Sequence, residues 1–279
     1  MAYKNLLSIA TDTKAAAAPL AQMAALAEDS GGHAEALCLG VDRSQTGYYY
    51  AGANAMILQE TLARAKEEAA ECRAFAEAAL GRSGVPFAAE EGVAQIADLG
   101  RHVAYHARFS DLVVLPGPYG RNSGPEAEPI VEAALFEGRA PVLIVPPKAP
   151  VLTKPKTVLV AWNESLEAMT AVRKAHPFLK AADLVRVVVI GPPQHGPERS
   201  DPGGMPSQLQ PRQGLTCESD GLSTTKTRAS DALIGHATDT AADLIVMGAY
   251  GHSRFREAIL GGATRNMLEQ AKIPVLMAH

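Results

Sequence analysis

Short apolar runs alternate with longer alanine-rich segments of helical period along the whole chain. Runs of this kind, rich in Leu, Val and Ile, are typical of buried parallel strands that are joined by helices. The pattern predicts strands in the first half at residues 6–10, 36–41, 112–115 and 142–145. It predicts strands in the second half at residues 158–161, 185–190, 244–247 and 275–278. Each half has one weaker candidate strand, at residues 87–90 and 215–218. An α/β fold is therefore expected.

The segments between these runs predict helices and one irregular region. Helices are expected at about residues 166–179, 230–240 and 255–270, and residues 48–77 lead into a long helix. Residues 191–214 are rich in Pro, Gly, Gln and Ser and can bury little apolar surface. This last segment is predicted to be an irregular, mobile loop.

The two halves repeat one another in letters as well as in pattern. Residues 111–115 read DLVVL and residues 243–247 read DLIVM, while residues 140–145 read APVLIV and residues 273–278 read IPVLMA. Such self-similarity indicates an internal duplication. A proline-rich stretch between the copies favours an extended connector. Two tandem domains are predicted, at residues 1–149 and 150–279.

Composition and charge narrow the classes of partner. The chain has 279 residues, 47% of them hydrophobic, and a net charge of -4. This charge removes the electrostatic basis for broad binding to nucleic acid or to an anionic membrane, so a small ligand or a protein partner is favoured. Three cysteines without a C-x-x-C pair, and no apolar run of about 18 residues, predict a cytoplasmic protein.

The most informative segment is a predicted strand, glycine turn and helix in the second half. Gly248, Gly251 and Gly261 follow the spacing G-x2-G-x9-G, and Thr264 lies just beyond. Small residues after a parallel strand leave backbone N–H groups open to an anion, and the next helix adds its unpaired N–H groups. The segment therefore indicates phosphate binding, although glycines also serve such turns for steric reasons alone.

This spacing, with residues 246–248, 260–261 and 274–276, resembles the universal stress protein family over the second half and, more loosely, over the first. The resemblance implies two flavodoxin-like domains of strand order 3-2-1-4-5. It implies an intrachain pseudo-dimer in which residues 142–145 pair with residues 275–278. It also implies a stress-response regulator that binds ATP, with ADP or AMP as alternatives and with or without Mg²⁺. A protein partner of unknown identity and a homodimer of the tandem chain are further expectations.

The same resemblance assigns the nucleotide site of the second domain. The residues are Ala161, Trp162, Asn163, Met247, Gly248, Gly251, Gly261, Gly262, Ala263 and Thr264. Gly262 stands where the family has a hydroxyl residue, which removes a hydrogen bond of about 1 kcal/mol. Asn163 stands where an Asp is expected and carries no charge. Trp162 would either stack on adenine or fill the cleft.

The first half carries a weaker version of the motif. Gly117 and Gly120 parallel the glycine pair of the second half, but Pro118 lacks an N–H, and Ile130 stands where the third glycine is expected. A phosphate site there would be incomplete, so a degenerate first domain is predicted. Asp12, directly after the first strand, is either the acidic residue of such a site or a helix cap.

The sequence gives little support for a metal site or for a catalytic motif. His102 and His106 lie four residues apart on a predicted helix, but no third metal ligand is visible in the sequence, so an ordinary surface pair is favoured. No nucleophile elbow, Walker lysine or dinucleotide fingerprint is present. A binding module is therefore favoured over an enzyme, with an empty-cleft scaffold and a slow ATP hydrolase as alternatives.

Overall fold

The computed structural model describes residues 2–43, 54–120, 123–190, 214–222, 228–249 and 262–279. The chain divides into two compact units, which we call the N-terminal unit (residues 3–140) and the C-terminal unit (residues 141–279 with the first two residues). The units divide just ahead of the last strand of the first repeat. The domain limits expected from the repeat, residues 1–149 and 150–279, stay a prediction.

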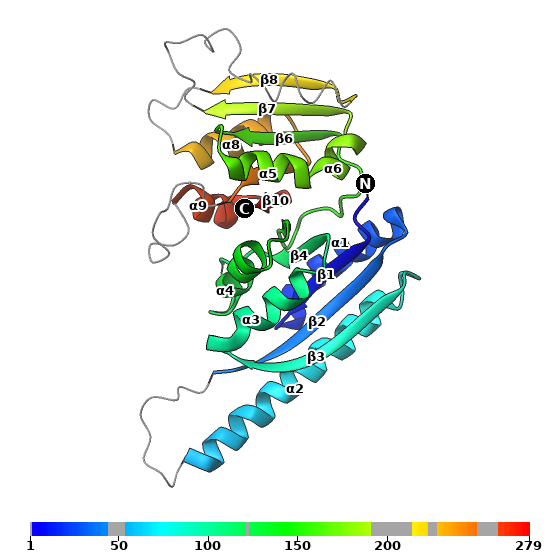
Figure 1. The fold of residues 1–279 in the computed structure, drawn as a ribbon, viewed down its shortest axis with the longest axis vertical. Coiled ribbons are helices and arrows are strands. Elements are labelled where there is room, and N and C mark those ends of the chain that lie inside the picture. The colour runs from blue at the N-terminus through cyan, green and yellow to red at the C-terminus, as the bar shows by residue number, and fades with distance from the viewer. Residues whose placement is uncertain (1, 44–53, 121–122, 191–213, 223–227, 250–261) are drawn as a thin grey trace. The chain divides into compact units, whose positions relative to one another are not determined.

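The N-terminal unit is an α/β unit whose four strands are parallel and follow the order β3-β2-β1-β4 (Figure 1). Helices α1 and α2 pack on each other and on this sheet, while α3 packs with α4 and the π-helical turn η1. The elements in chain order are β1 (Asn5–Ala10), α1 (Thr13–Ser30), β2 (His33–Asp42), α2 (Asn54–Leu80), β3 (Phe87–Gln95), α3 (Ile96–Ala107), β4 (Leu112–Pro116), α4 (Ala127–Glu132) and η1 (Ala133–Glu137).

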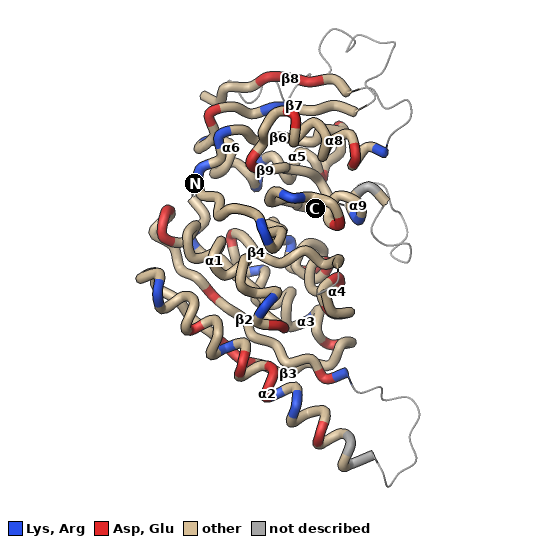
Figure 2. The backbone as a smooth tube through the Cα atoms, turned by 180° about the vertical axis from the view of Figure 1, so that it is seen from behind, with Lys and Arg blue, Asp and Glu red and all other residues tan. Residues whose placement is uncertain are grey.

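Helix α2 combines a buried contact with the sheet and a charged outer side. A Cβ built on Gly40 of β2 would lie 1.7 Å from the Ala65 carbonyl oxygen, so the close approach of α2 requires a glycine there. Lys and Arg are interspersed with Glu along the helix (Figure 2). Ion pairs at i,i+4 join Arg64 to Glu68 and Arg73 to Glu77. The long helix predicted from the sequence is thus an amphipathic cover of β2 and β3.

The C-terminal unit contains a sheet of order β5-β10-β9-β6-β7-β8. All neighbouring strands are parallel except β5 and β10, which are antiparallel. Helix α5 packs on β9 and β10, and α8 packs on β7 and on α9. The elements in chain order are β5 (Val142–Val145), β6 (Thr157–Trp162), α5 (Leu166–Lys174), α6 (His176–Ala181), β7 (Leu184–Ile190), β8 (Cys217–Leu222), α8 (Ala229–Asp239), β9 (Leu244–Gly248), α9 (Gly262–Gln270) and β10 (Val275–Ala278).

The strand order confirms the expected topology of the second repeat. Strands β8-β7-β6-β9-β10 are the third, second, first, fourth and fifth of that repeat, which is the order 3-2-1-4-5. The expected pairing of residues 142–145 with residues 275–278 is also confirmed, because Val275 pairs with Ile144 and Met277 with Val142. The two strands cover each other's backbone groups, which an edge strand would leave open.

One sequence expectation is modified by the structure, and a second lies almost wholly outside the described residues. The helix expected over residues 166–179 is broken at Ala175 into α5 and α6, because Pro177 has no N–H to continue the ladder and instead stands in the first turn of α6. The loop predicted over residues 191–214 lies, except for Gly214, outside the described residues. Among the described helices, none is long and apolar enough to cross a membrane.

Both repeats anchor their first strand with the same carboxylate. Asp111 Oδ2 accepts hydrogen bonds from the backbone N–H groups of Lys4 (2.8 Å) and Asn5 (2.9 Å). In the second repeat, Asp243 Oδ2 accepts them from the two equivalent residues 156 and 157, at 2.7 and 3.0 Å. This shared contact explains why an Asp precedes the fourth strand of each repeat. It also sets β1 and β6 in correspondence.

Candidate functional site

The carboxyl ends of β6 and β9 bring several of the expected site residues together. Ala161 pairs with Met247, and Gly248 pairs with Ala278 of the neighbouring strand β10. Trp162 ends β6 and is 9% exposed. In open α/β sheets, ligands bind at this edge, in the crevice outside the strand ends. The structure therefore places Ala161, Trp162, Met247 and Gly248 at one sheet edge.

The turn that follows β6 is held by its own side chains. Asn163 is exposed, and its Oδ1 accepts a hydrogen bond from the Ser165 N–H at 3.3 Å. Ser165 caps α5, since its Oγ accepts from the Ala168 N–H at 3.1 Å. Between them, Glu164 has a left-handed φ of 62°, a conformation that costs a non-glycine residue about 1 kcal/mol or more. This strained turn fixes Asn163 at the sheet edge.

Gly248 is required by packing, whatever its role toward a ligand. A Cβ at this position would lie 2.5 Å from the Ala168 N and 2.7 Å from the Glu167 carbonyl carbon, both at the start of α5. The next residue, Ala249, donates its N–H to the Ala278 carbonyl at 2.9 Å. The end of β9 is therefore pressed against α5 and joined to β10.

A second part of the site lies where α8 and α9 begin. Arg228, Ala229, Ser230 and Gly262 line a hollow at these two helix starts. A Cβ on Gly262, the first residue of α9, would meet no atom within 4 Å, so this backbone is open. The N–H groups at the start of a helix and a guanidinium group both suit an anion.

The two helices are tied together by a buried amide. Asn266 Nδ2 donates to Ser230 Oγ at 2.8 Å and to Asp231 Oδ1 at 2.6 Å. Thr264, expected to supply a hydroxyl, is buried at 5% exposure, so its side chain is packed inside the unit. Arg228 and Ser230 were not expected from the sequence, because no spacing motif connects them to the glycine-rich loop.

The structure describes little or nothing of the three remaining expected residues, Gly251, Gly261 and Ala263. Gly251 and Gly261 lie outside the described residues, together with the rest of residues 250–261. Ala263 lies within α9, but only its backbone is described. The assignment of all ten expected residues to a nucleotide site stays a prediction.

The corresponding crevice of the N-terminal unit is a small cavity of about 40 Å³. Asp12, Ser123 and Glu126 are among its lining residues, at the carboxyl ends of β1 and β4. Asp12 caps α1, because its Oδ1 accepts from the Ala15 N–H at 2.8 Å. The helix-cap reading of this residue is thus confirmed. A site for a drug-sized ligand needs about 300 Å³ or more, so the cavity is far too small for a nucleotide.

A buried carboxylate fills part of that crevice. Glu126 has a side chain 5% exposed, and its Oε1 accepts from Arg43 Nη2 at 3.0 Å. The carboxyl group lies over Gly124, where a Cβ would approach it to 2.5 Å. A nucleotide phosphate would meet this negative charge, which among the described residues is paired with the Arg43 guanidinium. The geometry and the charge both disfavour a phosphate here.

Comparisons with known proteins show which family and which solved structures the chain resembles. Residues 154–279 match the model of the universal stress protein family. Universal stress protein Slr1230 of Synechocystis sp. is 29% identical over 137 residues, which are 49% of this chain and 46% of that protein. The chain thus matches about half the length of this curated relative.

Solved structures resemble the chain over nearly its whole length. A universal stress protein from Archaeoglobus fulgidus has a TM-score of 0.74 at 14% identity, and the aligned residues make up 98% of this chain and 96% of that protein's chain. A putative universal stress protein from Pseudomonas aeruginosa has a TM-score of 0.60 at 15% identity, and the aligned residues make up 99% of this chain and 93% of that protein's chain. At such identities the likeness shows the fold alone.

The strand order 3-2-1-4-5 of parallel strands defines a flavodoxin-like α/β fold. More particularly, residues 154–279 match the universal stress protein family, which supports the resemblance seen in the sequence over this segment. The N-terminal unit shares the fold, whereas the match to the family model begins at residue 154.

Proposed function

We propose that this chain is a stress-response regulator that binds one adenine nucleotide, ATP with ADP or AMP as alternatives, in its C-terminal unit. One observation carries the proposal. Within the segment that matches the universal stress protein family, the open edge of β6 and β9 belongs to the same unit as two helix starts that carry Arg228 and Gly262. A sheet edge suits the base and ribose, and helix starts suit the phosphates.

The residues divide between the two ends of the nucleotide. Trp162 and Asn163 would face the base and ribose, and the Gly262 N–H and the Arg228 guanidinium would hold the phosphates. Gly251 and Gly261 are expected from their spacing to add backbone donors. Affinity should be modest, because Asn163 has no charge and Gly262 has no hydroxyl. Mg²⁺, if used, would be bound mainly by the phosphates and water.

The N-terminal unit is not proposed as a nucleotide site. Its crevice measures about 40 Å³ and contains the buried Glu126 carboxylate. One nucleotide per chain is therefore expected. The regulator would act in the cytoplasm through a protein partner, and light scattering of the purified chain would show whether it is a monomer or a homodimer.

The first experiment identifies the retained ligand. Freshly purified protein is denatured and the released small molecules are analysed by mass spectrometry. Retained ATP supports the proposal, and retained ADP or AMP supports the same site with another nucleotide or with slow hydrolysis. No retained nucleotide, together with no heat on calorimetric titration with ATP and Mg²⁺, would reject nucleotide binding and favour a scaffold.

The second experiment uses two substitutions at the start of α9. Gly262→Ser adds the hydroxyl that the family has at this position, while Gly262→Ala adds only the methyl group. Both side chains fit, because a Cβ meets no atom within 4 Å. If the missing hydroxyl weakens binding, Gly262→Ser should tighten ATP binding by up to about tenfold and Gly262→Ala should not.

A third substitution tests the phosphate side independently. Arg228→Gln removes the only described charge that lines the hollow and should weaken ATP binding about tenfold, with a smaller effect on adenosine. Arg265→Gln is the matched control on α9, since Arg265 pairs with Glu269 at 2.9 Å. Equal losses in both variants would contradict a specific role of Arg228.

A further inference from the structure

A cluster of three potential metal ligands lies on the N-terminal unit. Glu35 of β2, Glu90 of β3 and His106 of α3 offer ligand atoms that all lie within 4.8 Å of one another. His106 Nδ1 is 2.6 Å from Glu35 Oε1. Glu35 and His106 are half-buried, and Glu90 is exposed. The sequence pointed to His106 but not to its two partners.

The fold holds the three side chains together. Glu35 pairs with Ala88 in the register of β2 and β3, so Glu90, two residues further along β3, points to the same face as Glu35. Helix α3 packs against β3. Each ligand therefore comes from a different regular element, and none lies on a loop.

The cluster has an excess of negative charge. Within the described part of the chain, His106 is the ion-pair partner of Glu35, and no Lys or Arg pairs with Glu90. Two carboxylates thus face a single imidazole, with solvent access at Glu90. Carboxylates this close together favour a cation between them.

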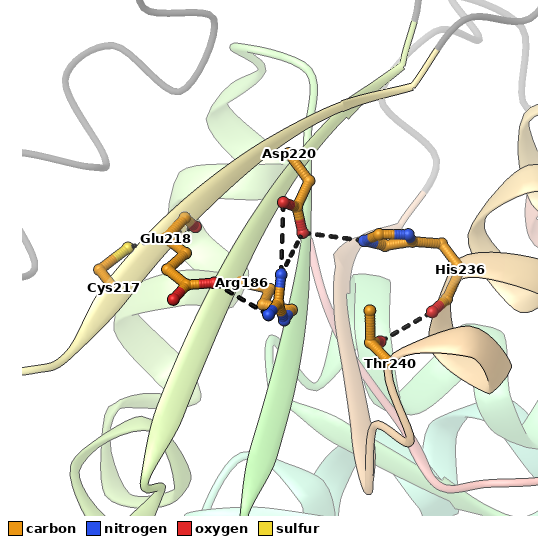
Figure 3. Close-up of polar contacts among 6 residues, drawn as sticks. All are labelled: Arg186, Cys217, Glu218, Asp220, His236 and Thr240. Carbon is orange, nitrogen blue, oxygen red and sulfur yellow. Dashed lines mark hydrogen bonds and ion pairs between the residues drawn. The ribbon is translucent and has the colours of Figure 1, made fainter.

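The second repeat contains the corresponding cluster with a different composition. His236 Nε2 lies 2.8 Å from Asp220 Oδ2, and Arg186 Nη1 donates to the same oxygen at 3.0 Å (Figure 3). Arg186 Nη2 pairs with Glu218 at 2.9 Å. In this unit a guanidinium occupies the space between the carboxylates.

The strand registers make the correspondence specific. Because β1 and β6 correspond, Glu35 of β2 stands where Arg186 stands in β7, and Glu90 of β3 stands where Asp220 stands in β8. In both repeats, the histidine comes from the helix that precedes the fourth strand. In the first repeat the Glu35 carboxylate therefore replaces the guanidinium, and it lies beside the Glu90 carboxylate and the His106 imidazole.

We propose that Glu35, Glu90 and His106 bind a divalent transition-metal ion of the Zn²⁺ or Mn²⁺ class. One imidazole and two carboxylates are ordinary ligands for these ions, and three protein ligands leave open positions for water. Ligands bound at about 2.0–2.2 Å lie roughly 3–4 Å apart, so the observed separations require only small side-chain rotations. The ion would lie between His106 Nδ1 and Glu35 Oε1, in place of the hydrogen bond that joins them.

The test uses the whole chain, freed of metal with a chelator, and titrates it with Co²⁺ and Zn²⁺. Co²⁺ gives an optical signal that depends on its ligands, and calorimetry gives the stoichiometry for Zn²⁺. One ion per chain is expected. Glu90→Gln should weaken binding at least tenfold, and Glu35→Arg, which copies the arrangement of the second repeat, should abolish it.

His102→Gln is the matched control, because His102 is exposed one turn away on the same helix and is not part of the cluster. It should leave the affinity unchanged. Urea unfolding of each metal-free variant shows that it is folded. The proposal is overturned if the wild type binds neither ion at micromolar concentration, or if Glu90→Gln and Glu35→Arg bind as it does. It is also overturned if His102→Gln loses as much affinity, or if bound Co²⁺ shows thiolate charge transfer.

Discussion

Replacing Gly248 by alanine should destabilise the C-terminal unit even in the absence of any ligand. The added Cβ would lie 2.5 Å from the Ala168 N and 2.9 Å from the Glu167 Cβ. Ordinary contacts of this kind are about 3.5–4 Å, so the start of α5 must move by about 1 Å. Overpacking of this size costs about 1–3 kcal/mol.

Urea unfolding of nucleotide-free protein measures this cost. Trp162, the only tryptophan, is buried in the same unit and reports on its unfolding by fluorescence. A loss of about 1–3 kcal/mol in the free energy of unfolding is expected for Gly248→Ala. Any accompanying loss of ATP binding would then follow from the displaced helix and would not identify Gly248 as a phosphate ligand.

Gly262→Ala provides the control within the same sequence motif. Its Cβ meets no atom within 4 Å, and alanine is the better helix former, so stability should be unchanged or raised by about 0.5 kcal/mol. If Gly248→Ala is as stable as the wild type, or if both alanine variants are equally destabilised, the packing argument is wrong.

Two further predictions concern the charges that organise the C-terminal unit. Asp243→Ala removes the acceptor of two backbone N–H groups and should lower the free energy of unfolding by about 1–3 kcal/mol in the same urea assay. The control Asp239→Ala, at an exposed position, should have almost no effect. Equal effects of the two substitutions would contradict this role of Asp243. Burial raises the pKa of Asp220, but the hydrogen bonds from His236 and Arg186 outweigh it and leave the pKa below its ordinary value of 3.8. This carboxylate therefore stabilises the fold above about pH 4 and loses that contribution as the pH falls further. Asp220→Asn should therefore reduce the dependence of the free energy of unfolding on pH below about pH 4. Parallel pH profiles of the wild type and the variant would refute the argument.

The buried strands could be predicted from the sequence, because their hydrophobic runs coincide with their positions in the sheet. Residues 142–145 and 275–278 form β5 and β10 with the expected bounds. The edge strand β8 was harder to place, since Cys217–Leu222 contains polar residues on a half-exposed strand and has no apolar run. The break between α5 and α6 was readable in principle from Pro177, because proline cannot continue a helical ladder.

The sites depend more on tertiary contacts than the strands do. The glycine spacing identified the end of β9 and the start of α9, but Arg228 comes from another helix, which the buried Asn266 side chain ties to α9. Similarly, the helical spacing of His102 and His106 suggested a pair, whereas the partner of His106 is Glu35, 71 residues away in sequence. Only the pairing of parallel strands and the packing of the helix bring such residues together.

The two repeats differ in a way that follows from the kind of contact each position makes. Asp111 and Asp243 both accept from backbone N–H groups, which are present whatever the side chains, so the same residue serves both repeats. Glu35 and Arg186 instead contact other side chains, where a change of sign is tolerated once a partner compensates the charge. The backbone contacts therefore preserve one scaffold, while the side-chain clusters on it are free to take different ligands. A variant that exchanges Glu35 for arginine should then alter metal binding in the N-terminal unit without changing nucleotide binding in the C-terminal unit.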